Sequence, residues 1–570
     1  MIMETTIQKS LRENKGTRWL ALILASLSIF GAYFFNYALS PVKPLLESVL
    51  GWNSSDFGTY TSAYGWLNVF AFMLIISGII LDKLGIRKTG LGATIVMFIG
   101  TAINYWAVVS HFPEGSKIFG LKAQVFWSAV GFALFGVGTE AIGITISKAV
   151  VKWFKGKEMA LAMGMQMAIA RLGTLLALAI SLPLARDFNV QAPILLALIL
   201  MLLGIISFIY YSVLDKRLDA SEKDLIIKSP EDEFRIKDIK YIITNRGFWY
   251  IALLCVLFYS AVFPFLFYAT DLMINKYHVE PGLAGLIPSL LPFGTIILTP
   301  LFGGIYDYKG KGATIMVIGS LILILVHGVL MLPFLKAWWI AAAMVIILGI
   351  GFSLVPSAMW PSVPKIIPEK QLGTAYAVIF WIQNIGLLAV PLLLGYVLDK
   401  TNPDVAPNKY AIKTAIETAY KKTLASYNFN KKEFNTLIEK GTAAGIDFVV
   451  KYATYEAASN VNIEQIKNEI ASNLINKLQQ VNIPANDKKA IEKLAIQIAK
   501  DTIYQVATKY KLNLRYDYFY DMLIFFTLSL LSLIFALLLK REDRIKGYGL
   551  ELPNKDFKMQ AQKENKQPEA

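Results

Sequence analysis

Twelve long apolar runs constrain this sequence more than any other feature. A helix of about 20 mostly apolar residues spans the roughly 30 Å hydrocarbon core of a bilayer, and a soluble domain cannot bury so many runs of that length. The runs cover residues 19–40, 59–81, 89–110, 123–147, 158–183, 192–213, 247–273, 284–305, 313–333, 337–359, 372–398 and 518–540. We therefore predict an all-α membrane protein with twelve transmembrane helices, whose termini share one side because the number of spans is even.

The composition excludes several other classes of protein. Hydrophobic residues make up 55% of the 570 residues and charged residues 17%. The net charge is +15, but the bases gather between apolar runs and in one late segment, without the interleaved aromatics of a nucleic-acid surface. A single cysteine, Cys255, allows no intrachain disulfide and no cysteine metal cluster. Catalytic triads, metal-ligand spacings and phosphate loops are absent as well, so we expect no enzyme, no cofactor and no metal.

Basic residues mark one side of the predicted bundle. Short loops rich in lysine and arginine face the cytoplasm in most membrane proteins. The short connections on this side contain Lys83, Arg87, Lys88, Lys148, Lys152, Lys155, Lys157, Lys309, Lys311, Lys365 and Lys370. We predict that this side and both termini are cytoplasmic. The composition, rich in lysine, asparagine and isoleucine, is typical of bacteria, so the predicted location is a bacterial cytoplasmic membrane.

A short pattern of glycines, an acid and bases occurs twice. It comprises Gly78, Asp82, Gly85 and Arg87 after the second span, and Gly303, Asp307 and Gly310 after the eighth. Glycine permits a tight turn, the acid can attract the positive end of a neighbouring helix, and the bases hold the loop at the cytoplasmic surface. These loops are candidates for gating. The repeat predicts two pseudo-symmetric six-helix halves, the usual architecture of secondary transporters with a substrate site at the midplane.

The predicted domain organisation follows from the spans and from a charged stretch between the sixth and seventh, where signs alternate as in a solvated linker. It consists of the N-terminal half at 1–213, a cytoplasmic linker at 214–246, helices seven to eleven at 247–400, an insert at 401–516, helix twelve at 517–541 and a cytoplasmic tail at 542–570.

The insert at residues 401–516 interrupts the second half and is predicted to be extracytoplasmic. Apolar residues at helical spacing recur in it, at Ile412, Ile416 and Tyr420, at Ile463, Ile466, Ile470, Leu474 and Leu478, and at Ile491, Leu494 and Ile498. We expect a small helical bundle whose acids alternate with lysines on solvated faces. Nothing in it indicates catalysis, and binding a protein partner is one role that it could serve.

Two charged residues lie deep inside spans of the first half. Glu140 is twelve residues before Lys152 and Arg171 fourteen after Lys157, which places both about 18 to 21 Å from those lysines, near the midplane. Charges at that depth are costly and either pair or serve a function. The two could neutralise each other and lock a helix hairpin. Alternatively, Glu140 could bind the ammonium of a zwitterion and Arg171, with its planar fork, the carboxylate.

Polar and aromatic residues at similar depth are candidates for further substrate contacts. In the second half these are Ser353, Trp381, Gln383 and Asn384, for which helix packing is an equal alternative. Residues that could line a polar cavity, or simply pack, are Tyr33, Asn36, Tyr60, Tyr64 and Tyr259. Of this second group, Tyr64 and Tyr259 are the preferred candidates.

In its twelve spans, its six-plus-six repeat and its doubled loops, the chain resembles the major facilitator superfamily, although Ile86 stands where a base is common. A closer resemblance is to the family of lysosomal dipeptide transporters of that superfamily and their bacterial relatives. It is carried by WFKGKE at 153–158, ARLG at 170–173, AVFPF at 261–265, MWP at 359–361, QLGTAY at 371–376 and IQN at 382–384. In that family an acid on the fourth helix and an arginine on the fifth bind the two ends of a dipeptide. The resemblance implies these roles for Glu140 and Arg171, whereas the insert is not part of the family pattern.

The residues and the resemblance together predict a secondary transporter for dipeptides or similar small zwitterions that works by alternating access. Uniport is favoured because the charge of Arg171 beside Glu140 should keep that acid ionised. The glycine loops are expected to shut the cytoplasmic side in the outward-open state. Two alternatives stay open: an organic-anion carrier of the same superfamily that uses Arg171 alone, and a carrier-like receptor or assembly subunit that acts through the insert.

Overall fold

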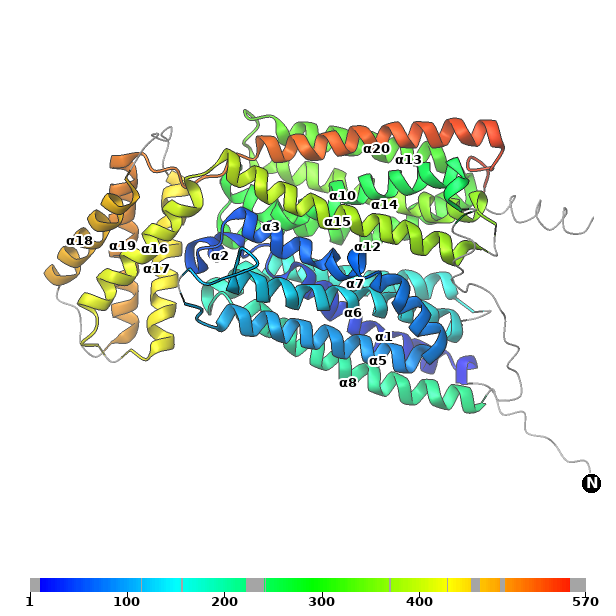
Figure 1. The fold of residues 1–570 in the computed structure, drawn as a ribbon, viewed down its shortest axis with the longest axis horizontal. Coiled ribbons are helices and arrows are strands. Elements are labelled where there is room, and N and C mark those ends of the chain that lie inside the picture. The colour runs from blue at the N-terminus through cyan, green and yellow to red at the C-terminus, as the bar shows by residue number, and fades with distance from the viewer. Residues whose placement is uncertain are drawn as a thin grey trace, which may run out of the picture.

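The computed structural model describes residues 11–113, 115–154, 157–221, 240, 242–368, 371–427, 429–452, 462–481 and 487–553. Its regular structure is almost entirely helical, because a backbone inside a bilayer must satisfy its own hydrogen bonds and an isolated apolar run does so only as a helix. Eleven of the described helices are long and apolar enough to cross a membrane. Shorter helices joined end to end supply one more crossing, so the fold has twelve spans in two halves of six (Figure 1).

The first half comprises mostly unbroken spans. It begins with the 3-10 helix η1 (Leu11–Glu13), and its unbroken spans are α1 (Lys15–Ala38), α6 (Ala123–Phe154), α7 (Met159–Asp187) and α8 (Ala192–Ser221). A short helix, α2 (Lys43–Leu50), follows α1, and an antiparallel hairpin of β1 (Lys117–Ile118) and β2 (Leu121–Lys122) precedes α6. Helix α1 packs against α7 and α8, so the fifth and sixth spans flank the first.

The second span is not the single helix over residues 59–81 that the sequence predicts. It consists of α3 (Ser54–Ser62), the 3-10 helix η2 (Ala63–Gly65), α4 (Trp66–Phe70) and the first part of α5 (Met73–Val109). A break falls at Phe72, whose φ is 53°. Helix α5 then turns at Gly85, with φ 75° and ψ 173°, a conformation open mainly to glycine, and continues as the third span. Broken helices are tolerated in membranes where they line a cavity, and η2 does so here.

The second half repeats this arrangement. Its helices are α10 (Arg246–Asn275), the single turn α11 (Pro281–Ala284), α12 (Leu286–Lys309), α13 (Gly312–Met331), α14 (Trp338–Ile366), α15 (Leu372–Thr401) and α20 (Phe519–Lys546). The connection from α12 to α13 turns at Gly310, where φ is 68°. Each half therefore turns at a glycine of its repeated loop, Gly85 or Gly310, whereas Gly78 and Gly303 lie inside helices.

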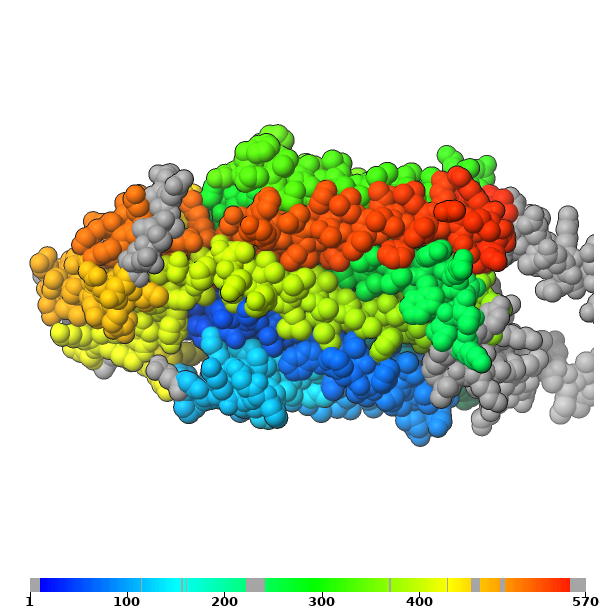
Figure 2. Space-filling view, turned by 45° about the horizontal axis from the view of Figure 1, so that its top comes forward, coloured from blue at the N-terminus to red at the C-terminus, as the bar shows by residue number. Residues whose placement is uncertain are grey.

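Four helices between α15 and α20 form a bundle beyond one end of the spans, as predicted. They are α16 (Val405–Thr423), α17 (Lys431–Tyr452), α18 (Ile463–Gln480) and α19 (Lys488–Tyr510). Most apolar residues with helical spacing form its core: Ile412, Ile416, Tyr420, Ile466, Ile470, Leu474, Leu478, Ile491 and Ile498 are buried. Figure 2 shows this bundle, in yellow and orange, seated on the ends of the spans. We call that end of the molecule the insert side and the opposite end the termini side.

The two halves meet closely on the insert side. At the start of α3, the backbone N–H groups of Ser54 and Ser55 donate to the Asp399 carboxylate at the end of α15, over 2.8 and 2.7 Å. One turn further, a Cβ at Gly58 would lie 2.5 Å from the Pro391 carbonyl oxygen. Only glycine allows the two backbones to approach so closely, so the second and eleventh spans are in direct contact at this end.

Candidate functional site

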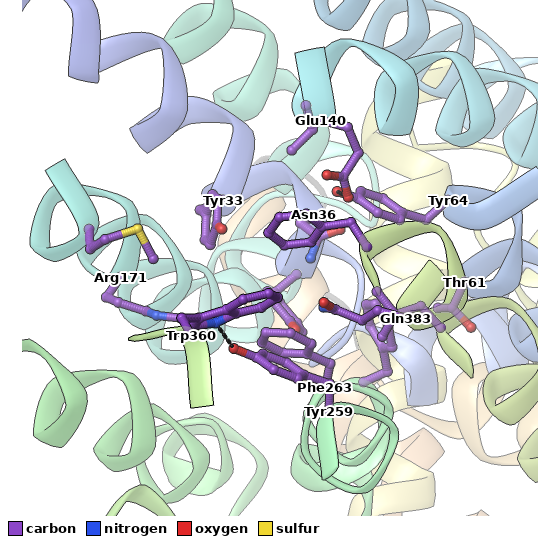
Figure 3. Close-up of a pocket in the computed structure, with 16 residues that line it drawn as sticks. Tyr33, Asn36, Thr61, Tyr64, Glu140, Arg171, Tyr259, Phe263, Trp360 and Gln383 are labelled. Atoms are coloured by element: carbon purple, nitrogen blue, oxygen red, sulfur yellow. Dashed lines mark hydrogen bonds between the residues drawn. The ribbon is translucent and has the colours of Figure 1, made fainter. Parts of the chain in front are cut away.

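A central cavity lies between the two halves (Figure 3). Its volume is about 220 Å³. Helices α1, α3, η2, α6 and α7 of the first half and α10, α14 and α15 of the second form its wall. The lining residues are Tyr33, Asn36, Tyr37, Thr61, Tyr64, Thr139, Glu140, Met167, Arg171, Tyr259, Phe263, Phe267, Trp360, Phe380, Gln383 and Leu387. A largely apolar chamber with a few convergent polar groups is the usual form of a small-molecule site.

Glu140 supplies the negative charge of this cavity. It lies in the middle of α6, and its Oε1 accepts a hydrogen bond of 2.9 Å from the Tyr64 hydroxyl of η2. The Asn384 side chain of α15 also lies beside it. Gly136, one turn earlier on α6, makes this contact between helices feasible, because a Cβ there would lie 2.5 Å from the Tyr64 carbonyl oxygen.

Arg171 supplies the positive charge from α7. Its guanidinium lies over aromatic rings, 5.0 Å from the ring centroid of Phe352 and 5.7 Å from those of Tyr33 and Phe263. Aromatic faces attract a cation but leave its N–H groups free to donate. The guanidinium is therefore held in place by rings from both halves, with its hydrogen-bonding capacity available to a ligand.

Glu140 and Arg171 line one cavity without pairing. Among the residues that the structure describes, neither side chain takes part in an ion pair. Figure 3 shows the two side chains at separate places on the wall. The arrangement differs from the hairpin-locking pair considered above, and it leaves an acceptor and a donor of opposite charge facing the same space.

The second half lines the cavity with aromatic and amide groups. Tyr259 of α10 accepts a hydrogen bond of 3.0 Å from Trp360 Nε1 of α14, as Figure 3 shows. The Trp360 ring stacks on Phe380 of α15, with centroids 4.7 Å apart. Gln383 reaches the same space from α15. This face is neutral, so any charge on a ligand would be bound by the first half.

The candidate residues named from the sequence separate into two groups. Tyr33, Asn36, Tyr64, Glu140, Arg171, Tyr259 and Gln383 line the cavity. Two others pack or join helices: Ser353 donates to the Gly349 carbonyl over 2.8 Å, and Trp381 Nε1 donates to the Val69 carbonyl over 3.1 Å. Asn384 does both, because its Nδ2 donates to the Phe380 carbonyl over 3.0 Å and its side chain also lies beside Glu140. Trp381 thereby connects α15 to the broken second span, and Tyr60 stacks on Phe132 outside the cavity wall.

The predicted gating loops lie on the termini side. Asp82 pairs with Lys148 over 2.6 Å, and Arg87 pairs with Asp219 over 2.7 Å, each within the first half. A Cβ at any of three loop glycines, Gly78, Gly85 or Gly303, would meet no atom within 4 Å. Gly310, by contrast, packs against Leu552 and Pro553. Asp307, the acid of the same loop, lies in the last turn of α12. The loop glycines of the first half thus face open space, whereas Gly310 of the second half is packed.

Sequence reasoning missed two sets of residues. The first consists of cavity residues such as Thr61, Phe263 and Trp360, and only the MWP stretch pointed toward Trp360. The second is a group of charges buried on the insert side, Lys43, Glu47, Asp271 and Lys409. Asp271 lies inside the predicted span 247–273. An acid within an apolar run indicates a buried partner or a function, as it does for Glu140.

The comparisons with known protein sequences identify relatives along most of the chain. The Major Facilitator Superfamily model matches residues 25–391. The lysosomal dipeptide transporter MFSD1 of Danio rerio is 29% identical over 396 residues, which cover 67% of this chain and 81% of that protein. The Homo sapiens protein of the same name is 27% identical over 398 residues, covering 67% and 80%.

Solved structures share the fold. A bacterial homologue of the human lysosomal transporter Spinster, in an inward-facing conformation, aligns with a TM-score of 0.53 and 12% identity, over 93% of this chain and 98% of that one. The inward-open xylose transporter of E. coli aligns with a TM-score of 0.51 and 13% identity, over 79% and 99%. At such identities these structures support the architecture alone.

Proposed function

Because this chain belongs to the Major Facilitator Superfamily, a family of membrane transporters, we propose that it carries dipeptides or similarly small zwitterions by alternating access. The observation that carries the proposal is that Glu140 and Arg171 line one cavity without pairing with each other. A ligand with an ammonium and a carboxylate would satisfy both charges at once. The relatives named as lysosomal dipeptide transporters support the same class of cargo.

In this proposal each part of the wall has a role. The ligand ammonium binds Glu140, whose orientation is set by the Tyr64 hydroxyl, and the ligand carboxylate binds the fork of Arg171. The aromatic wall formed by Tyr259, Trp360 and Phe380 packs against the remainder of the ligand. Since the second half contributes no charge to the lining, ligand charge is recognised by the first half and ligand shape by the second.

We also propose that the protein is a uniporter. From the sequence, the reason was a charge of Arg171 beside Glu140, but the two side chains do not pair, so the support is a different one. Glu140 is the single carboxylate among the described residues that line the cavity. If it binds the ligand ammonium in every cycle, no second cavity acid is left to carry a proton. Accumulation of substrate in liposomes driven by a pH gradient alone would contradict uniport.

We also propose an orientation in which the termini side is cytoplasmic and the insert faces outward, in the cytoplasmic membrane of a bacterium. The basic residues of the short loops support it, because Arg87, Lys148 and Lys152 lie on the termini side together with η1 and the end of α20. The exposure of tagged termini in intact and in opened cells tests this orientation.

Thermal stability of the purified protein tests the cargo. At about 100 times its dissociation constant a ligand adds roughly 2.7 kcal/mol to the native state, which is readily measured. We expect dipeptides to stabilise the protein, end-blocked dipeptides to have no effect, and both Glu140→Gln and Arg171→Ala to abolish the shift. Stabilisation by organic anions that persists in Glu140→Gln would replace the proposal with an organic-anion carrier. Flux into liposomes then establishes transport of each ligand that binds.

A further inference from the structure

Four charged side chains meet in one buried group on the insert side. Lys43 Nζ lies 2.5 Å from Glu47 Oε1 and 2.8 Å from Asp271 Oδ2, and Lys409 Nζ lies 2.9 Å from Glu47 Oε2. None of the four side chains is more than 3% exposed. Burying charges this completely is costly unless each has partners, so the two lysines and two acids depend on one another.

Two tyrosines complete this group. Tyr516, from the segment between α19 and α20, donates its hydroxyl to Glu47 Oε1 over 2.9 Å, and its ring centroid lies 4.1 Å from Lys43 Nζ and 4.8 Å from Lys409 Nζ. Tyr518 donates its hydroxyl to Asp271. We refer to these six residues, Lys43, Glu47, Asp271, Lys409, Tyr516 and Tyr518, as the insert-side gate.

The insert-side gate lies next to the cavity along α10. Asp271 lies one helical turn beyond Phe267 on α10, and Phe267 lines the cavity and stacks on Tyr37 of α1 with centroids 5.0 Å apart. Lys43 lies above Tyr268 on the same stretch, 6.0 Å from its ring centroid. The contact between Lys43 and Asp271 therefore lies next to the insert-side end of the cavity wall.

The charges are balanced across the surface along which the halves separate. Lys43 and Glu47 belong to α2 of the first half, whereas Asp271 belongs to α10 of the second half and Lys409 to the insert, which is continuous with the second half. Among these four residues, each side therefore carries one positive and one negative charge. Asp521 of α20 is buried in the second half and interacts electrostatically with both Lys43 and Asp271. Without Lys409 the closed group would have an excess negative charge, and the open second half would present Asp271 without its counter-charge.

The insert has a second attachment to the first half. Arg186, at the end of α7, pairs with Asp447 of α17, with Nη2 and Oδ1 2.8 Å apart. The ends of the insert are tied to each other, because Asn402 Nδ2 donates to the Asp517 carbonyl over 3.1 Å and Asp517 N–H returns a bond of 2.8 Å to Asn402 Oδ1. The insert is thus joined covalently to one half and by ion pairs to the other, so it spans the line of separation.

We propose that the insert is a working part of this transporter's gate, in which Lys409 holds Glu47 across the line of separation and thereby shuts the cavity on the insert side. The inference is independent of the cargo, because it concerns the closing of the cavity alone. It assigns a role in transport to a segment that is an addition to the six-plus-six architecture.

Access to a cysteine inside the cavity tests the gate. Thr61→Cys in a Cys255→Ala background places one thiol on the cavity wall. A membrane-impermeant maleimide, applied to the insert side of sealed vesicles, reaches this thiol only when the gate opens. Ser472→Cys, on the exposed face of α18, identifies the vesicle side that carries the insert.

Removing the charge of Lys409 should open the gate. We expect Lys409→Met to increase the labelling rate at least about tenfold, because Glu47 loses a buried partner. Lys413→Met is the matched control, since Lys413 is one turn further on α16 and pairs with Glu417 away from the gate. Its labelling rate should equal that of the parent. Equal rates for Lys409→Met and the parent would overturn the proposal.

A double variant distinguishes gating from misfolding. If Lys409 acts through Glu47, removing both charges leaves no uncompensated carboxylate, so Glu47→Gln with Lys409→Met should be labelled more slowly than Lys409→Met alone. A disrupted insert would not recover in this way. Labelling of the double variant as fast as that of Lys409→Met would show that Lys409 does not act through Glu47 and would also overturn the proposal.

Discussion

At the scale of single residues, the cavity depends on how Glu140 is held. The Tyr64 hydroxyl donates to Oε1 over 2.9 Å, and the Asn384 side chain also lies beside the carboxylate. Among the described residues, Arg171 has no hydrogen-bond acceptor, and its guanidinium lies against ring faces instead. The acid is therefore oriented by a hydrogen bond and the base by packing, so the two should respond differently to conservative substitutions.

Tyr64→Phe should weaken binding of a zwitterionic ligand by roughly ten- to a hundredfold, because a hydrogen bond to a charged group contributes about 1.5 to 3 kcal/mol. The dissociation constant of a dipeptide, measured by titration calorimetry, checks this. Tyr396→Phe is the matched control, as Tyr396 of α15 is 60% exposed and distant from the cavity wall. Unchanged affinity in Tyr64→Phe would mean that Glu140 is oriented without the hydroxyl.

At the scale of elements, two glycines of α6 have different environments although both lie within four residues of Glu140. Gly136 faces the backbone of η2, so a Cβ there would lie 2.5 Å from the Tyr64 carbonyl oxygen, whereas a Cβ at Gly143 would meet nothing within 4 Å. The close approach at Gly136 brings the broken second span against α6. Helix packing at this point thus positions the side chain that orients the acid.

Gly136→Ala should lower the free energy of unfolding by about 1 to 3 kcal/mol and weaken ligand binding, because backbone must move to admit the methyl group. Gly143→Ala should be neutral or stabilise the protein by about 0.4 to 1 kcal/mol. Thermal unfolding with and without a dipeptide measures both effects. Equal behaviour of the two variants would contradict the packing argument.

A second element-scale feature is the contact between α17 and the turn after α7. Glu439 of α17 lines a cavity there with Arg186 and Val190, and burial raises the pKa of its carboxyl to about 7. A raised pKa means that the docked insert binds the proton more tightly than the undocked chain does. The docked state is therefore most stable below the ordinary carboxyl range and loses stability as the pH rises through about 7.

The parent protein should accordingly lose thermal stability between pH 5 and pH 8, by up to about 3 kcal/mol. Glu439→Gln should remove this part of the pH dependence, because the amide does not titrate. Glu433→Gln is the control on the same helix: Lys488 lowers the pKa of the Glu433 carboxyl, so it titrates below this window. The melting temperatures of the parent, Glu439→Gln and Glu433→Gln, measured across this pH range, test the prediction. If the melting temperature of Glu439→Gln falls with pH as steeply as that of the parent, Glu439 is not the group that titrates.

At the scale of the whole molecule, the insert and the two halves form one mechanical system. The insert ends meet at Asn402 and Asp517, so the segment between them can be removed without stretching the second half. Lys409 and the Arg186 to Asp447 pair tie it to the first half. The halves should therefore fold without the insert, but without these ties the insert side should open more readily.

Excision of residues 404–514, which retains Tyr516 and Tyr518, should leave transport intact while the cavity cysteine becomes more accessible from the insert side. Flux in liposomes and maleimide labelling measure the two outcomes. Retained flux would argue against a receptor or assembly subunit that acts only through the insert. Abolished flux in a protein that still binds dipeptide would show instead that the insert is required for the transport cycle.

The sequence alone determined the spans, the two halves, the helical insert and the prediction that Glu140 and Arg171 lie far from the charged loops, and both line the central cavity. All of these follow from local properties: the length of an apolar run, the 3.6-residue period, and the number of residues from a charged loop. The break in the second span was missed, because Gly58, Gly65 and Phe72 act through contacts with α15 and not through their own hydropathy.

The tertiary structure alone decided which charges meet. Glu140 and Arg171 lie on consecutive helices yet stay unpaired, because Tyr64 from η2 and the rings of Tyr33, Phe263 and Phe352 occupy the space beside them. Conversely, Glu47 and Lys409 are far apart in the chain yet in contact. A lysine in an insert helix looks the same in sequence whether it faces water or an acid, since only the packing of all the helices determines its surroundings.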